Sequence, residues 1–84
     1  MIEISVGRYG MDKSDGIFDG NLHSVKQVIR DLEQVGLEIA RITVVLVPRF
    51  RRCRISFEDY ESLKRYYGSK RKYVTGIEIY YYDD

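Results

Sequence analysis

The sequence contains no tryptophan, only one cysteine and one proline, and no long run of apolar residues. A single thiol, at Cys53, excludes an internal disulfide, whereas secreted domains of this size usually carry several. The longest aliphatic run, residues 44–47, is far too short to span a bilayer. The first residues alternate between apolar and polar types and do not resemble a basic leader followed by an apolar stretch. The sequence therefore predicts a cytoplasmic protein without a signal peptide or a membrane contact.

An excess of one charge is also lacking, because 14 lysines and arginines face 13 aspartates and glutamates. Whole-molecule electrostatics therefore predict no strong attraction to an oppositely charged partner. The charges are unevenly distributed, however, and this indicates a bipolar molecule. Basic residues cluster at Arg49, Arg51, Arg52 and Arg54 and again at Lys70, Arg71 and Lys72, and acidic residues cluster at Asp12, Asp15 and Asp19.

The residues that could carry chemistry do not form a catalytic or metal-binding set. Cys53 is the only thiol and His23 the only imidazole. Cys53 is expected to point into the core from a strand, because free cysteine is among the most buried residue types. The aspartates near residues 12–19 lack the spacing of an EF-hand loop, and that segment lacks the Lys-Ser/Thr of a phosphate-binding loop. We therefore expect no enzyme activity, cofactor, metal or small-molecule substrate, although a weak cation site at these aspartates stays open.

What is present is a single globular domain, residues 1–84, with an unusually high tyrosine content. Its apolar and charged fractions are typical of globular proteins. Hydrophobic periodicity separates strand patterns from helix patterns, and residues 10–21, with three glycines, are expected to form a flexible loop. Strands are predicted near residues 2–7, 37–47, 50–55 and 73–82, and helices near residues 22–35 and 56–67.

Capping residues predict where the two helices begin and end. Ser24 has the spacing of a capping box with Gln27, and Asn21 is the alternative N-cap. Gly36 is placed for the left-handed position that follows a helix. In the second helix the same rules predict a start at Ser56, with Asp59 at the third helical position, and an end at Gly68.

Strand alternation predicts which side chains point away from the helices. In the second strand Ala40, Ile42, Val44 and Leu46 are expected to face inward, and Ile39, Arg41, Thr43, Val45 and Val47 outward. In the third strand the sequence predicts that Phe50, Arg52 and Arg54 point outward and Ile55 inward. Val74, Glu78, Tyr80 and Tyr82 are expected on the outer face of the last strand.

The predicted order, β-α-β-β-α-β, favours a ferredoxin-like split β-α-β fold in the α+β class. In this fold a four-stranded antiparallel sheet has both helices on one face. Pro48 and Arg49 are expected to turn the chain between the second and third strands; one long bent strand is the alternative. The opposite face of the sheet would then stay open.

An open face rich in tyrosine and arginine predicts a non-catalytic protein-binding module, because these residue types are enriched at interface hot spots. The partner would be another protein or a second copy of the chain. The roles that fit are an adaptor, a subunit of a complex, or an inhibitor of a larger assembly, of the kind that mobile elements encode. The expected partner-binding residues are Tyr9, Phe50, Arg52, Arg54, Glu78, Tyr80 and Tyr82.

Binding of RNA or single-stranded nucleic acid is the alternative. The RNA recognition motif shares the predicted topology, but its Lys/Arg-Gly-aromatic sequence is absent here. In this alternative Tyr80 and Tyr82 stack on bases, and basic side chains contact phosphates. The expected phosphate contacts are Arg49, Arg51, Arg52, Arg54, Lys70, Arg71 and Lys72.

Overall fold

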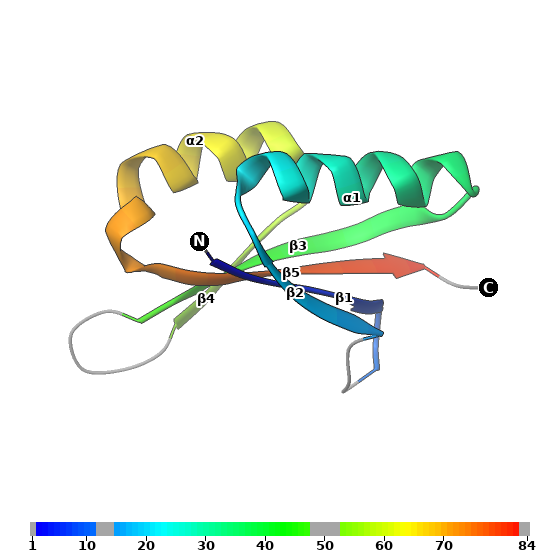
Figure 1. Ribbon diagram of the computed structural model, residues 1–84, viewed down its shortest axis with the longest axis horizontal. Coiled ribbons are helices and arrows are strands. Elements are labelled where there is room, and N and C mark those ends of the chain that lie inside the picture. The colour runs from blue at the N-terminus through cyan, green and yellow to red at the C-terminus, as the bar shows by residue number, and fades with distance from the viewer. Residues whose placement is uncertain (1, 12–14, 48–52, 83–84) are drawn as a thin grey trace.

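A computed structural model describes residues 2–11, 15–47 and 53–82 of the chain. These residues form one mixed sheet and two α-helices (Figure 1). The elements in chain order are β1 (Ile2–Arg8), β2 (Gly16–Gly20), α1 (Leu22–Gln34), β3 (Glu38–Leu46), β4 (Cys53–Phe57), α2 (Tyr60–Lys70), a short 3-10 helix η1 (Arg71–Tyr73) and β5 (Val74–Tyr82).

The sheet has five strands in the order β2-β1-β5-β3-β4, and both helices lie on one of its faces (Figure 1). β1 and β5 are parallel, and every other neighbouring pair is antiparallel. The α+β class and the two helices are confirmed. The predicted four-stranded antiparallel sheet is wrong, because there is a fifth strand and because β5, at the centre of the sheet, is parallel to its neighbour β1. The β3–β4 hairpin is confirmed, although Pro48 and Arg49 lie outside the described residues.

The additional strand, β2, lies inside the segment predicted as a loop. It pairs with β1 in antiparallel register, so that Phe18 is opposite Ile4 and Ile17 is opposite Ser5. Glycine and aspartate are depleted in strands, and they make up three of the five residues of β2. Local propensity therefore indicated a loop, whereas pairing with β1 determines the structure.

Asn21 is the N-cap of α1, so the alternative prediction was the right one and Ser24 is not the cap. The Asn21 Oδ1 accepts hydrogen bonds from the backbone N–H groups of His23 at 2.9 Å and Ser24 at 3.2 Å. The Ser24 hydroxyl accepts in return from the Asn21 N–H at 3.2 Å. This reciprocal pair satisfies N–H groups that a helix start leaves unpaired, and it fixes α1 directly after β2.

Gly36 follows the C-cap of α1 with φ +86°, which confirms its predicted role. Its N–H donates to the Glu33 carbonyl at 3.0 Å, and the Leu37 N–H donates to the Leu32 carbonyl at 3.0 Å. These two bonds are the Schellman pattern that closes a helix C-terminus.

α2 begins later and ends later than the sequence predicts. Its N-cap is Asp59, whose carboxylate accepts from the Ser62 N–H at 2.8 Å; this hydrogen bond lowers the pKa of Asp59 below its usual value. Ser56 belongs to β4 and pairs with Thr43, so its predicted role as N-cap is wrong. Gly68 does not end the helix, which continues to Lys70. Glycine in a helix interior costs stability but does not force an end.

We expect alanine substitutions at the two helix glycines to change stability in opposite directions. Gly36→Ala should lower the free energy of unfolding by about 1–2 kcal/mol, because a Cβ disfavours the left-handed backbone at this position. Gly68→Ala should raise it by about 0.5–1 kcal/mol, because no atom would contact the added methyl group and alanine is the better helix former. Urea denaturation of both variants measures the difference. Destabilisation of both proteins would contradict a helix that continues through Gly68.

The core lies between the helices and the sheet. Its fully buried side chains come from β1, β3, β5 and both helices: Ile4, Ile42, Val44, Ile77, Ile79, Val25 and Leu63. Two register shifts change the predicted faces. Ile39 and Arg41 pair with the consecutive residues Tyr81 and Tyr80, so Ala40 is an extra residue and Ile39 packs against the core.

A second shift at Thr75 brings Val74 into the core, which corrects its predicted place on the outer face. A β-bulge inserts one residue and so changes which side chains share a face. No helix in the described part of the chain is long and apolar enough to cross a membrane.

Candidate functional site

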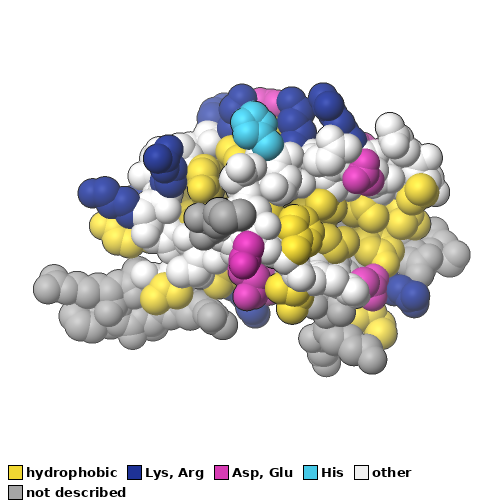
Figure 2. Space-filling view, viewed as in Figure 1, with side chains coloured by type: hydrophobic (Ala, Val, Ile, Leu, Met, Phe, Trp, Pro, Cys, Tyr) yellow, Lys and Arg dark blue, Asp and Glu magenta, His cyan; other side chains and the backbone are white. Residues whose placement is uncertain are grey.

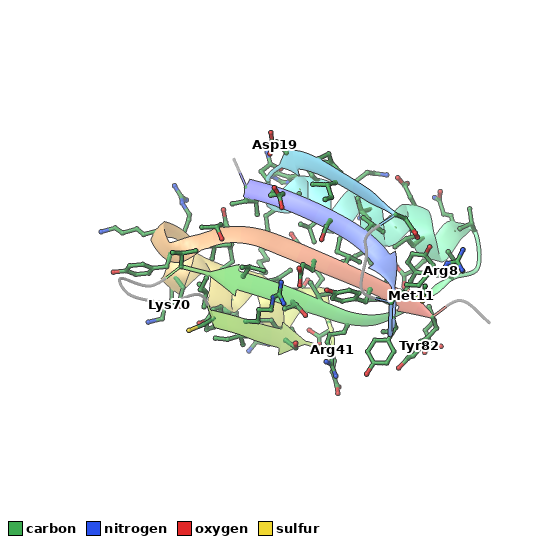
Figure 3. All side chains as sticks on the ribbon, turned by 90° about the horizontal axis from the view of Figure 1, so that it is seen from below. Arg8, Met11, Asp19, Arg41, Lys70 and Tyr82 are labelled. Carbon is green, nitrogen blue, oxygen red and sulfur yellow. The ribbon has the colours of Figure 1, made fainter. Side chains whose placement is uncertain are left out.

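The sheet face opposite the helices is covered by no helix in the described part of the chain (Figures 1 and 3). We call it the open face. The strand registers place mainly polar and aromatic side chains of β1, β3, β4 and β5 on it. These residues are Glu3, Ser5, Arg41, Thr43, Val45, Arg54, Ser56, Glu78, Tyr80 and Tyr82.

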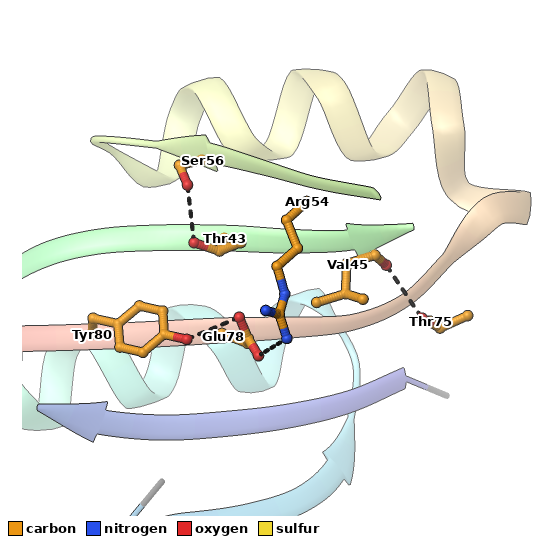
Figure 4. Close-up of polar contacts among 7 residues, drawn as sticks. All are labelled: Thr43, Val45, Arg54, Ser56, Thr75, Glu78 and Tyr80. Atoms are coloured by element: carbon orange, nitrogen blue, oxygen red, sulfur yellow. Dashed lines mark hydrogen bonds and ion pairs between the residues drawn. The ribbon is translucent and has the colours of Figure 1, made fainter. Parts of the chain in front are cut away.

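A network of charged and polar side chains occupies the centre of the open face (Figure 4). Arg54 Nη2 lies 3.2 Å from Glu78 Oε2, and the Tyr80 hydroxyl donates to Glu78 Oε1 at 2.9 Å. Partial burial and the neighbouring Glu78 carboxylate raise the pKa of Tyr80. Both oxygens of Glu78 therefore have partners within the chain.

The Arg54 side chain crosses β3 to reach Glu78 on β5 (Figure 4). It starts opposite Val45 on β3, and Val45 is only 6 % exposed. Val45 therefore faces outward as predicted but adds almost no exposed aliphatic surface to the open face. Beside it, the Thr43 and Ser56 hydroxyls are 3.1 Å apart. The centre of the face is thus polar and internally satisfied.

One end of the open face carries an exposed aromatic and cationic cluster. The rings of Tyr9 and Tyr82 meet edge to face with centroids 5.5 Å apart. The Arg41 guanidinium lies 5.4 Å from the centre of the Tyr9 ring, within the range of a cation–π interaction. Met11 is also exposed at this end (Figure 3). We call Tyr9, Met11, Arg41 and Tyr82 the tyrosine end.

A groove of about 500 Å³ lies between the tyrosine end and the Arg54–Glu78 pair. Hydroxyl groups of Thr43, Ser56 and Tyr80 are among its lining groups, and Arg41 and Arg54 bring guanidinium groups to it. Arg54 pairs with Glu78, whereas Arg41 pairs with no carboxylate among the described residues. The groove therefore has a cation at one end whose charge is not neutralised within this part of the chain.

The structure brings together five of the seven residues predicted to bind a partner: Tyr9, Arg54, Glu78, Tyr80 and Tyr82. Phe50 and Arg52 lie outside the described residues. The prediction of site residues omitted Met11 and Arg41. Arg41 had a signal, since it alternates with Thr43 on the outer side of its strand. Met11 had none, because nothing in a loop sequence shows which sheet face the loop adjoins.

The basic residues predicted to contact phosphate are not gathered at the tyrosines. Lys70, Arg71 and Lys72 are exposed at the end of α2 and in η1, and Lys70 lies at the opposite end of the sheet from Tyr82 (Figure 3). Arg54 is engaged with Glu78. The other three predicted contacts, Arg49, Arg51 and Arg52, lie outside the described residues.

The single thiol and the single imidazole line separate surface hollows. Cys53 is half-buried against the core and lies near Lys70 and Tyr73, whereas His23 lies at the start of α1 near Phe18. Among the described residues, no group of three or more potential ligands could hold a metal ion.

The predicted aspartate cluster is divided in the structure. Asp15 accepts a hydrogen bond from the Tyr81 hydroxyl, and this bond raises the pKa of Tyr81. The Asp15 N–H donates to the Val6 carbonyl at 2.6 Å, so both groups tie the segment before β2 to the sheet. Asp19 lies in β2, and Asp12 lies outside the described residues. In the described part, Asp15 therefore has a structural role.

Comparison with known protein families, with curated proteins and with solved structures finds no match for this chain.

Proposed function

We propose that this chain is a non-catalytic protein-binding module whose tyrosine end and adjoining groove bind a carboxylate-bearing segment of a partner protein. The observation that carries the proposal is Arg41, held on an exposed tyrosine ring beside a groove and without a carboxylate partner among the described residues. Roles as an adaptor, a complex subunit or an inhibitor of a larger assembly fit such a module.

The composition of the tyrosine end supports a protein partner. Tyrosine, methionine and arginine are enriched in the buried centres of interfaces, and tyrosine and arginine dominate their hot spots. Tyrosine presents a large rigid surface at a low cost in conformational entropy. The contact with Tyr9 also holds Arg41 in place before binding, which reduces the ordering cost of association.

The charge of the groove supports a carboxylate as the group that enters it. Among the described residues that line the groove, Arg54 neutralises Glu78, so Arg41 is the charge left to attract a ligand. A guanidinium donates two parallel hydrogen bonds to an aspartate or glutamate side chain, which is a strong and directional contact. A second copy of the chain would bring Arg41 against Arg41 in a twofold contact at this end, so a different protein is the better partner.

The test is capture of partner proteins from a lysate of the encoding organism, followed by affinity measurement with the purified partner. Wild-type chain should retain the partner after nuclease treatment at about 150 mM salt, where interactions between distant exposed charges are screened. Arg41→Glu should weaken binding by about 30-fold or more, as expected for a hot-spot arginine. Lys70→Glu is the matched control, because it reverses an exposed charge at the opposite end of the sheet and should leave the affinity unchanged.

The same experiment tests the nucleic-acid alternative. Capture that disappears on nuclease treatment, and that depends on Lys70 and not on Arg41, would replace the proposal with nucleic-acid binding through the basic end of α2. Equal capture by wild type and Arg41→Glu would exclude the tyrosine end as the contact surface.

A further inference from the structure

β2 is an edge strand with no neighbour on its outer side in the described part of the chain. Its inner side pairs with β1 along its whole length. Asp19 lies at the rim of the sheet in the view from below (Figure 3). An unpaired edge presents a row of backbone N–H and C=O groups that fits one kind of occupant, another extended polypeptide.

Each face of this edge carries one exposed apolar side chain of β2. Ile17 is 61 % exposed and shares the open face with Ser5, and Phe18 is 39 % exposed and shares the helix face with Ile4. Two exposed apolar neighbours at an edge are unusual, because proteins normally place lysine, proline or inward charges there. The other edge strand, β4, has no such pair, since Ile55 packs against the core and its neighbour Arg54 is charged.

A hollow above β2 would receive a side chain of the added strand. It has a volume of about 590 Å³ and is lined by Phe18 from β2 and by Ser24, Gln27 and Val28 from α1. Figure 2 shows apolar side chains along this side of the molecule, below the basic top and the single histidine. An apolar residue opposite Phe18 would therefore lie against Val28.

We propose that the outer edge of β2 binds an extended segment of a partner protein as an additional antiparallel strand. The segment would have apolar residues opposite Ile17 and Phe18 and a lysine or arginine opposite Asp19. Because the added strand runs antiparallel, its sequence reads basic, apolar, apolar. This surface is separate from the tyrosine end and does not depend on the function proposed for it.

The residues of β2 argue against a second copy of the chain as the occupant. A twofold antiparallel pairing centred on Phe18 places Ile17 opposite Asp19 of the second copy, an apolar side chain against a charge. Pairing centred on Ile17 places Asp15 opposite Asp19, and pairing centred on Asp19 places the two Asp19 residues together. Like charges directly opposite destabilise a strand pair, whereas a basic residue opposite Asp19 stabilises it.

The experiment is selection of a displayed library of random peptides, about ten residues long, on the immobilised full chain. The enriched peptides, made synthetically, serve as probes. We expect a shared basic-apolar-apolar pattern and an affinity that falls about tenfold or more in Ile17→Lys and in Phe18→Lys. Val35→Lys is the matched control, because Val35 is 73 % exposed and lies outside the strand, so this variant should bind the probes as wild type does.

Two further readouts separate strand addition from other binding modes. Asp19→Lys should shift the selected peptides to aspartate or glutamate at the basic position, a result that misfolding cannot produce. Hydrogen exchange at the backbone amides of residues 16–20 should slow when the probe binds. The proposal would be overturned if no peptides were enriched, or if Val35→Lys weakened peptide binding as much as Phe18→Lys. It would also be overturned if peptide binding left hydrogen exchange in β2 unchanged. If Arg41→Glu abolished peptide binding and Phe18→Lys retained it, the peptides would bind at the tyrosine end, and this result would also overturn the proposal.

Discussion

Replacement of Leu63 by alanine is expected to lower the free energy of unfolding by about 2–5 kcal/mol, the usual cost of removing a large buried aliphatic side chain. Leu63 is 0 % exposed and is the only fully buried residue of α2. The other contacts of α2 with the core come from half-buried tyrosines. Small domains are stable by only about 5–15 kcal/mol, so this substitution should remove a large part of the total. Urea denaturation followed by circular dichroism measures it.

Val35→Ala is the control for this experiment. Val35 caps α1 and its side chain is 73 % exposed, so truncation there should change stability by less than about 0.5 kcal/mol. If Leu63→Ala lowered the free energy of unfolding no more than Val35→Ala does, the Leu63 side chain would not anchor α2 to the sheet.

Gly20→Ala is expected to destabilise the protein by about 1–3 kcal/mol, the usual cost of inserting an atom into a filled site. A Cβ at Gly20 would lie 2.6 Å from the Ser24 Oγ and 2.8 Å from both the Ser24 Cβ and the Ile4 Cδ1. The Ser24 Cβ cannot yield without moving the first turn of α1, and Ile4 is fully buried. The substitution would therefore disturb the helix cap and the core together.

Gly16→Ala provides a control in the same strand. No atom lies within 4 Å of the position that its Cβ would take, so this variant should unfold at nearly the wild-type urea concentration. Thermal or urea denaturation of the two alanine variants gives the comparison directly. Similar midpoints for both would show that β2 and α1 are less closely packed at Gly20 than the structure indicates.

Local patterns predicted most of the elements because each pattern depends on residues close together in the chain. The apolar spacing of residues 22–35 identified α1, and alternation in residues 73–82 identified β5. Gly36 was correctly placed because a left-handed residue after a helix has a local signature. The end of α2 was missed because Gly68 occupies an ordinary helical position, and glycine alone does not distinguish the two cases.

The sheet topology could not be predicted because its determinants are not local. No residue in β1 indicates that its neighbour is β5 or that the two strands are parallel. The bulge at Ala40 reverses the outward and inward positions before it, and simple alternation cannot reveal an extra residue. The strand β2 forms because β1 lies alongside it, although its own composition is typical of a turn.

The candidate site was predicted in part for the same reason. Alternation placed Arg54, Glu78, Tyr80 and Tyr82 on one face, and they do share it. Their contacts depend on the order of the strands, since the ion pair of Arg54 with Glu78 requires a side chain to cross an intervening strand. That crossing explains why Arg54 and Glu78 neutralise each other at the centre of the face, and why Arg41 is the available cation among the described residues of the groove.

The position of β5 also has a consequence for biosynthesis. β5 is the strand that joins the β1–β2 hairpin to the β3–β4 hairpin, and it is the last of the five strands to leave the ribosome. In a nascent chain that lacks β5, the strand that joins these two hairpins in the described sheet is missing. The pairing of Glu3 with Gly76, which joins β1 to β5, can form only after β5 has been synthesised. Contacts between residues so far apart in the sequence form slowly.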